Sequence, residues 1–115
     1  MMKAQLLHNT RCSKSRAAVE YLDSKKVDFE IIHLLKEPLT LEELRAVVEK
    51  LKIKPSELIR KTDALFKDNF AGQNLAEEDY LKIMQENPSL IQRPILVIED
   101  QAEIGRPLEN FDRIL

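Results

Sequence analysis

The sequence contains little cysteine, glycine or tryptophan. Its 115 residues include one cysteine, two glycines and no tryptophan. Because Cys12 is alone, the chain cannot form an internal disulfide or a multi-cysteine zinc or iron–sulfur site. The two glycines, Gly72 and Gly105, lie too far apart for a phosphate-binding loop, which needs several glycines in a short stretch. These absences exclude dinucleotide-binding turns, P-loops and metal clusters built on cysteine.

An excess of one charge and a long apolar run are also absent. The formal net charge is −2, from 18 basic and 20 acidic residues, so we expect no nucleic-acid or membrane partner. No stretch approaches the ~20 apolar residues of a membrane span, and the N-terminus lacks the apolar segment of a secretory signal. With 43% hydrophobic and 33% charged residues, the composition predicts one globular domain over residues 1–115 and a cytoplasmic location.

The first third of the chain predicts a βαβ unit. Residues 3–7 predict a short strand that runs into a polar loop. A helical pattern begins at about residue 13. The β-rich segment Val27–Leu35 has apolar residues at consecutive positions, which predicts a strand buried on both faces. We expect the two strands to be parallel and joined by a right-handed crossover.

Helical patterns fill residues 40–87. Thr40 and Glu43 have the spacing of a capping box, which predicts a helix that starts after Thr40. Pro55 is suited to the first position of a short helical turn, and a further helix is expected over 76–86. The segment is therefore expected to be a helical insertion between two halves of a sheet.

The last part of the chain predicts a ββα half. Residues 94–99 and 102–105 read as two short strands of an antiparallel hairpin. Pro107 can open a final amphipathic helix that uses Leu108, Phe111 and Ile114. A βαβ half and a ββα half around one mixed four-stranded sheet is the α/β layout of thioredoxin and glutaredoxin.

The single cysteine is the strongest candidate for chemistry. Cys12 is expected where the first strand gives way to a helix, so the positive end of the helix dipole faces its sulfur. Arg11, Lys14 and Arg16 add positive charge, and such surroundings lower the pKa of a thiol. Ser15 lies three residues on, where dithiol enzymes have a second cysteine. A hydroxyl can donate to the thiolate but cannot resolve a mixed disulfide, so an external thiol is needed.

These residues belong to a longer pattern. The run from His8 to Arg16, His-Asn-Thr-Arg-Cys-Ser-Lys-Ser-Arg, resembles the His-Asn-x-x-Cys-x-x-Ser-Arg loop of the glutaredoxin-coupled arsenate reductase family. Further matches follow in the family's order and spacing: Leu58-Ile59-Arg60-Lys61, Asn87-Pro88, Ile91-Gln92-Arg93-Pro94-Ile95 and Gly105-Arg106-Pro107. The resemblance covers essentially the whole chain.

The resemblance implies a role for each matched residue. Cys12 corresponds to the cysteine that attacks arsenate, and Arg60, Arg93 and Arg106 to three arginines that hold the oxyanion. Arginine suits that role because its planar guanidinium donates two parallel hydrogen bonds to an anion. The resemblance also implies that the Arg93–Pro94 bond is the cis-proline junction that faces the cysteine.

Two histidines are further candidates for the site, and the loop departs from the family pattern at two positions. His8 has a pKa near 6.5 when unperturbed and is expected to support the Cys12 thiolate, whereas His33 is interpreted as structural. Neither forms a credible metal site. Thr10 stands where many family members have proline, and Arg11 adds a charge beside the nucleophile, which alters the rigidity and anion preference expected of the loop.

The expected function is arsenate reduction without a bound cofactor, with glutathione as co-substrate and glutaredoxin as partner. The second hypothesis is an enzyme of the same fold that acts on glutathionylated thiols; it would need Cys12 but would have little use for Arg106. The third is a regulator that resembles Spx and binds RNA polymerase. That class uses a Cys-x-x-Cys switch, which Ser15 makes impossible here.

Overall fold

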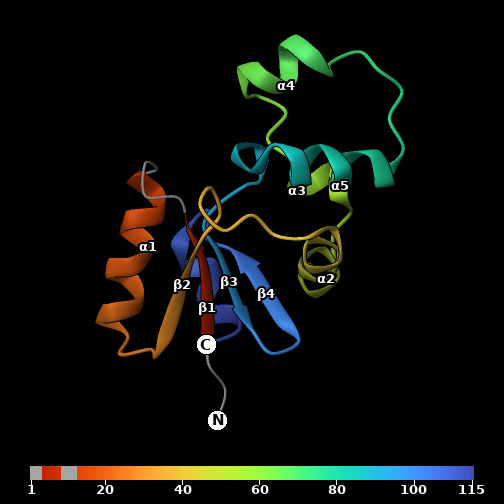
Figure 1. Cartoon of the computed structure of the whole chain (residues 1–115). Helices are drawn as coiled ribbons and strands as arrows, with labels where there is room; N and C mark the ends of the chain where they lie inside the picture. Colours follow the sequence, from red (N-terminus) through yellow and green to blue (C-terminus); the bar gives the residue numbers. More distant parts are fainter. Residues whose placement is uncertain (1–3, 9–12) are drawn as a thin grey trace. The chain divides into compact units, whose positions relative to one another are not determined.

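The computed structural model describes residues 4–8 and 13–115, except for the side chains of residues 13–15 (Figure 1). The chain divides into two compact units. The first joins Met1–Glu37 to Arg93–Leu115, and the second is Pro38–Gln92. The helical insertion expected at residues 40–87 falls within the second unit.

The first unit is built on a mixed four-stranded sheet. Its strands are β1 (Ala4–His8), β2 (Phe29–His33), β3 (Ile95–Ile98) and β4 (Gln101–Ile104), in the order β2-β1-β3-β4. The β1–β2 pair is parallel, whereas β3 is antiparallel to both β1 and β4. The parallel pair and the hairpin confirm the thioredoxin-like layout predicted from the sequence.

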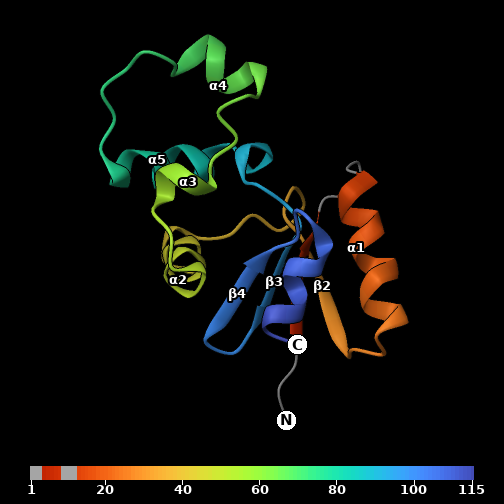
Figure 2. The same ribbon diagram turned by 180° about the vertical axis from the view of Figure 1, so that it is seen from behind.

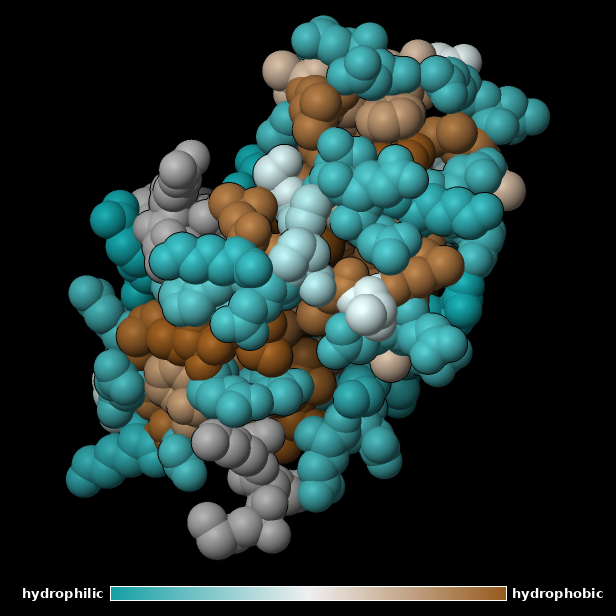
Figure 3. Space-filling view, viewed as in Figure 1, coloured by the Kyte–Doolittle hydropathy of each residue, from teal (hydrophilic) through white to brown (hydrophobic). Residues whose placement is uncertain are grey.

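The prediction that the second strand is buried on both faces is wrong. Strand β2 lies at an edge of the sheet, and both Glu30 and Ile31 are exposed. Figure 3, viewed from the same side as Figure 1, shows hydrophobic residues at the surface among hydrophilic ones. The sequence pattern misleads because consecutive apolar residues are typical of central parallel strands, whereas β2 has a neighbouring strand on one side only.

One face of the sheet packs against the helix α1 (Ser13–Ser24) and the 3-10 helix η2 (Leu108–Arg113). Figure 2 shows η2 lying across this sheet. The core between these layers contains alanine and leucine side chains and the ring of one phenylalanine: Ala4, Leu6, Ala18, Leu22, Leu96 and Phe111. The Tyr21 hydroxyl donates to the Asp112 carboxylate at 2.9 Å, which links α1 to η2. The helix expected after Pro107 is thus present as a 3-10 helix.

Gly105 and Phe111 pack against each other with no room for a side chain. A Cβ built on Gly105 would lie 2.6 Å from Cζ of Phe111, and the ring itself is completely buried. Atoms at that separation overlap, so the close approach of η2 to the end of β4 requires glycine at this position.

The second unit is helical. Its elements are α2 (Leu41–Leu51), α3 (Pro55–Leu58), α4 (Ala64–Asn69), α5 (Glu77–Glu86) and the 3-10 helix η1 (Pro88–Leu90). The capping box before α2 is confirmed: the backbone N–H of Glu43 donates to the Thr40 hydroxyl at 3.1 Å, and the N–H of Thr40 donates to the Glu43 carboxylate at 3.0 Å. The starts of α3 at Pro55 and of α5 at Glu77 also agree with the sequence predictions.

Helix α4 was not predicted. Its signal in the sequence is Asp63, whose side chain accepts from the backbone N–H of Leu65 at 2.9 Å and so caps the helix. With six residues and one buried apolar side chain, Phe66, α4 is too short to show a helical period. Among the helices of the described residues, none is long and apolar enough to cross a membrane.

Candidate active site

The hairpin of β3 and β4 carries two of the predicted site residues at its open end. The strands pair Ile95 with Ile104, and the N–H of Gly105 donates to the carbonyl oxygen of Pro94 at 2.8 Å, which extends the pairing by one step. Arg93 and Arg106 are the next residues beyond this bond, outside both strands. The antiparallel register therefore brings together two arginines that are 13 residues apart in sequence.

A hydrogen bond joins the two arginines directly. Nε of Arg106 donates to the backbone carbonyl oxygen of Arg93 at 2.7 Å. Arg93 is only 8% exposed, whereas Arg106 is exposed as a residue. Both guanidinium groups are permanently charged, so this end of the sheet concentrates positive charge that favours an anion.

Both arginines precede a cis proline. The Arg93–Pro94 bond is cis, as the family resemblance implies, and so is Arg106–Pro107. The second cis bond was not foreseen. The available signal was the repetition of the dipeptide Arg-Pro at the two ends of one predicted hairpin.

Arg60 belongs to the second unit. It follows α3, and its backbone N–H donates to the carbonyl oxygen of Leu90 at 2.7 Å, beside a bridge between Ile59 and Ile91. Its Nη1 lies 3.6 Å from the carboxylate of Asp63. The structure therefore pairs Arg93 with Arg106 in one unit and describes Arg60 within the other.

His8 and His33 form a pair at the carboxyl ends of β1 and β2. They are register partners in the parallel ladder, and their ring centroids are 5.8 Å apart. His8 is 4% exposed, and neither Nδ1 atom has a hydrogen-bond partner among the described residues. Burial, and secondarily the charge of His33, lower the pKa of His8. His8 is therefore held largely neutral near pH 7.

Strand β1 ends at His8, four residues before Cys12 in the sequence. Leu7 pairs with Ile95, so the next residue of β1, His8, ends its strand near the level of Pro94. Cys12 follows His8 by four residues and lies outside the described residues. Ser15 falls in the first turn of α1, and its side chain also lies outside the description.

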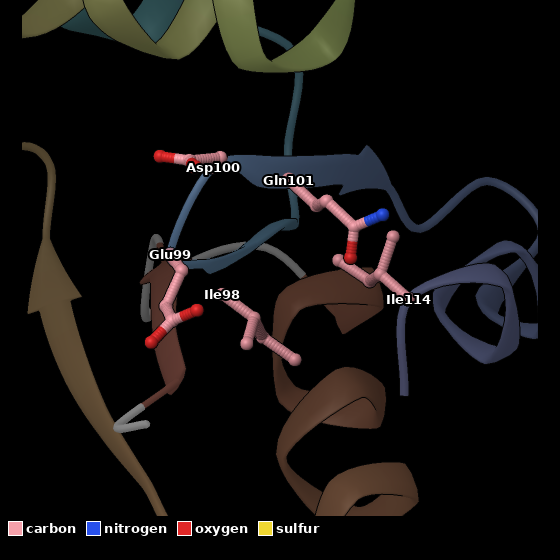
Figure 4. A pocket seen from close by; sticks show the side chains of 5 residues that line it. All are labelled: Ile98, Glu99, Asp100, Gln101 and Ile114. Carbon is pink, nitrogen blue, oxygen red and sulfur yellow. The ribbon is translucent and has the colours of Figure 1, made fainter. Parts of the chain in front are cut away.

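A surface pocket of about 320 Å³ lies at the opposite end of the sheet. It is lined by the β3–β4 turn and Ile114 (Figure 4). Val97 pairs with Gln5, which places this turn near the start of β1, away from His8. Figure 4 shows Asp100 directed away from the other lining side chains. The pocket is therefore separate from the pair of Arg93 and Arg106. The described residues contain no cluster of three metal-binding side chains.

Comparisons with known proteins identify the family of the chain. An arsenate reductase of Neisseria meningitidis is 34% identical, with all of both chains covered. The solved structure of an arsenate reductase from Vibrio cholerae superposes with a TM-score of 0.93 at 32% identity, over 99% of this chain and 98% of that one. The global transcriptional regulator Spx of Enterococcus faecalis is 32% identical over 92% of this chain and 79% of its own length. The model of the ArsC family matches residues 7–114, and the chain belongs to the ArsC family.

Proposed function

We propose that this protein reduces arsenate, with Cys12 as the nucleophile and with Arg60, Arg93 and Arg106 as ligands of the oxyanion. The observation that carries the proposal is the contact between Arg106 and Arg93 at the open end of the hairpin, in a chain that belongs to the ArsC family. Two arginines at the open end of one hairpin suit a tetrahedral oxyanion, because each guanidinium can donate two hydrogen bonds to adjacent oxygens.

The position of Cys12 in the sequence supports its assignment as the nucleophile. Helix α1 begins at Ser13, the next residue. The first N–H groups of a helix lack partners within the helix, and together with its dipole they stabilise a nearby negative charge. A thiol that precedes such a helix is favoured as the thiolate, which is the form that attacks.

The first step is substitution at arsenic. The Cys12 thiolate forms a sulfur–arsenic bond, and one arsenate oxygen leaves with protons as water. Arsenic stays in the +5 state. The arginines hold the remaining oxygens and stabilise the charge that builds on them as the new bond forms.

The second step reduces arsenic with glutathione as the co-substrate. The glutathione thiolate attacks the Cys12 sulfur, so a disulfide forms between the two sulfurs, and the electron pair of the sulfur–arsenic bond passes to arsenic. Arsenite in the +3 state leaves. A glutaredoxin thiol then attacks the glutathione sulfur and releases the Cys12 thiolate. An external thiol is necessary because the chain has no second cysteine.

The test is oxidation of NADPH coupled through glutathione reductase, with glutathione, glutaredoxin and arsenate present. We expect arsenate-dependent turnover in the wild type, no turnover in Cys12→Ser, and a large loss in Arg93→Ala and in Arg106→Ala. The matched control is Arg45→Ala, because Arg45 is an arginine of α2 that pairs with Glu78 within the second unit. Loss of turnover in the control as well would remove the special role of the two hairpin arginines.

A second candidate function is reduction of glutathionylated thiols by the same cysteine. The arginine pair favours arsenate because this alternative has little use for Arg106. If the wild type reduces a glutathionylated peptide well but gives no turnover with arsenate, the alternative replaces the proposal.

The likeness to Spx favours a third candidate, a regulator that binds RNA polymerase. Ser15 argues against a disulfide switch, since the position that would carry the second cysteine holds a hydroxyl. Stoichiometric binding of polymerase without reductase activity would support this candidate over the first two.

A further inference from the structure

We infer that Asn110 is a positioning residue for Arg106, an inference that rests on the proposed role of Arg106 in binding the oxyanion. Asn110 lies in η2, and its side-chain nitrogen donates to the carbonyl oxygens of Ile104 at 3.2 Å and of Arg106 at 3.3 Å. Its backbone N–H donates to the carbonyl oxygen of Pro107 at 3.0 Å. One residue thus binds three of the four carbonyl groups in the segment 104–107.

Two further contacts hold this segment at Gly105. The N–H of Gly105 donates to Pro94, and the Phe111 ring lies against Gly105 at a distance that excludes a Cβ. The backbone on each side of Arg106 is therefore attached to β3 through Gly105 and to η2 through Asn110.

Arg106 needs such support because its own residue surface is exposed. An exposed arginine side chain has several rotatable bonds, and ordering it costs conformational entropy. Nε of Arg106 reaches the Arg93 carbonyl only if the Arg106 backbone stays close to the start of β3. Fixing the carbonyl of Arg106 limits that movement, so removing the Asn110 amide should loosen the bond from Nε to Arg93.

The residue type fits this role. An asparagine amide has two N–H donors and an acceptor, and here its nitrogen spans two carbonyls that are two residues apart. Leucine has a similar size and no donor, so Asn110→Leu removes the two hydrogen bonds while filling much of the same space. The matched control is Asn69→Leu in α4, because the Asn69 amide also donates to one backbone carbonyl, that of Leu65 at 2.9 Å.

The first measurement is a double-mutant cycle on arsenate turnover. We expect Asn110→Leu to raise the KM for arsenate about fivefold, the effect of one net hydrogen bond, with a smaller change in kcat and no effect in the Asn69→Leu control. In an Arg106→Ala background the same substitution should change the KM less than about twofold, because residues that act through one another are not additive. An equal rise in both backgrounds would overturn the inference.

The second measurement follows the hydrogen bond of Arg106 by NMR and does not depend on enzyme activity. The Nε–H signal of Arg106, assigned in a ¹⁵N NMR spectrum by its loss in Arg106→Lys, reports the hydrogen bond to Arg93. We expect Asn110→Leu to shift this signal and speed its exchange with water, whereas Asn69→Leu leaves it unchanged. An unchanged signal in Asn110→Leu would refute the positioning role even in an active enzyme. A shifted signal in a protein that does not reduce arsenate would instead refute the proposed function alone.

Discussion

Arg106 donates from Nε to the backbone carbonyl oxygen of Arg93 at 2.7 Å, across the open end of the β3–β4 hairpin. The bond uses one of the five guanidinium donors of Arg106, and it ties the side chain of one proposed anion ligand to the backbone of another. The two residues lie just beyond the last pair of the β3–β4 ladder, Ile95 with Ile104, and beyond the bond from Gly105 to Pro94.

Arg106→Lys is expected to weaken arsenate binding although the charge is kept. A lysine ammonium is a point charge that cannot replace the planar fork of arginine, and it has no Nε–H with which to contact the Arg93 carbonyl. We expect the KM for arsenate to rise about tenfold or more, the effect of losing one hydrogen bond to a charged group. Steady-state kinetics, with Arg45→Lys as control, measure this. A wild-type KM in Arg106→Lys would contradict the bidentate role.

Gly105→Ala is expected to destabilise the fold because its Cβ would overlap the Phe111 ring. Overpacking of this kind costs about 1–3 kcal/mol in the free energy of unfolding, measurable by urea denaturation. The smaller side chain of Phe111→Leu should relieve the overlap, so the double variant should be more stable than the sum of the two single effects predicts. Simple additivity would show that the contact is not the cause.

Stability is expected to fall on acidification because of His8. Burial, with the charge of His33 as a second cause, lowers the pKa of His8, while the unfolded chain takes up the proton near pH 6.5. Between these two values the unfolded state binds more protons, so the free energy of unfolding decreases as the pH falls through about 6.5, and it levels off below the pKa of folded His8.

The measurement for His8 is urea denaturation at about pH 7.5 and about pH 5.5, where most carboxylates stay ionised. The wild type should lose stability over this interval, and His8→Asn should lose less. His33→Gln should also reduce the slope, by a smaller amount, since His33 is the second cause of the shift. Equal slopes in wild type and His8→Asn would contradict the prediction.

Thr40→Ala is expected to destabilise the second unit by about 1 kcal/mol, the usual effect of losing an N-cap side chain. The substitution leaves the N–H of Glu43 without the hydroxyl that accepts from it. Thermal or urea unfolding measures the loss. Thr62→Ala, at an exposed threonine, is the control and should change stability much less; similar losses in both variants would remove the capping explanation.

Local sequence signals predicted those elements whose stabilising contacts lie within a few residues. The Thr40–Glu43 capping box and the turn started by Pro55 are confirmed for this reason, as each depends on neighbours in the chain. The sequence does not predict helix α4, because a six-residue helix with one buried apolar side chain shows no helical period.

By itself, the sequence determined the order of the four strands and of the helices other than α4, the absence of a resolving cysteine, and which arginines are candidates for an anion site. Only the tertiary structure decided that Arg106 contacts Arg93, that β2 is an edge strand, and that His8 lies beside His33. The physical reason is that hydrophobic patterns report which face of an element is buried, whereas strand order and register depend on pairing between residues far apart in the chain.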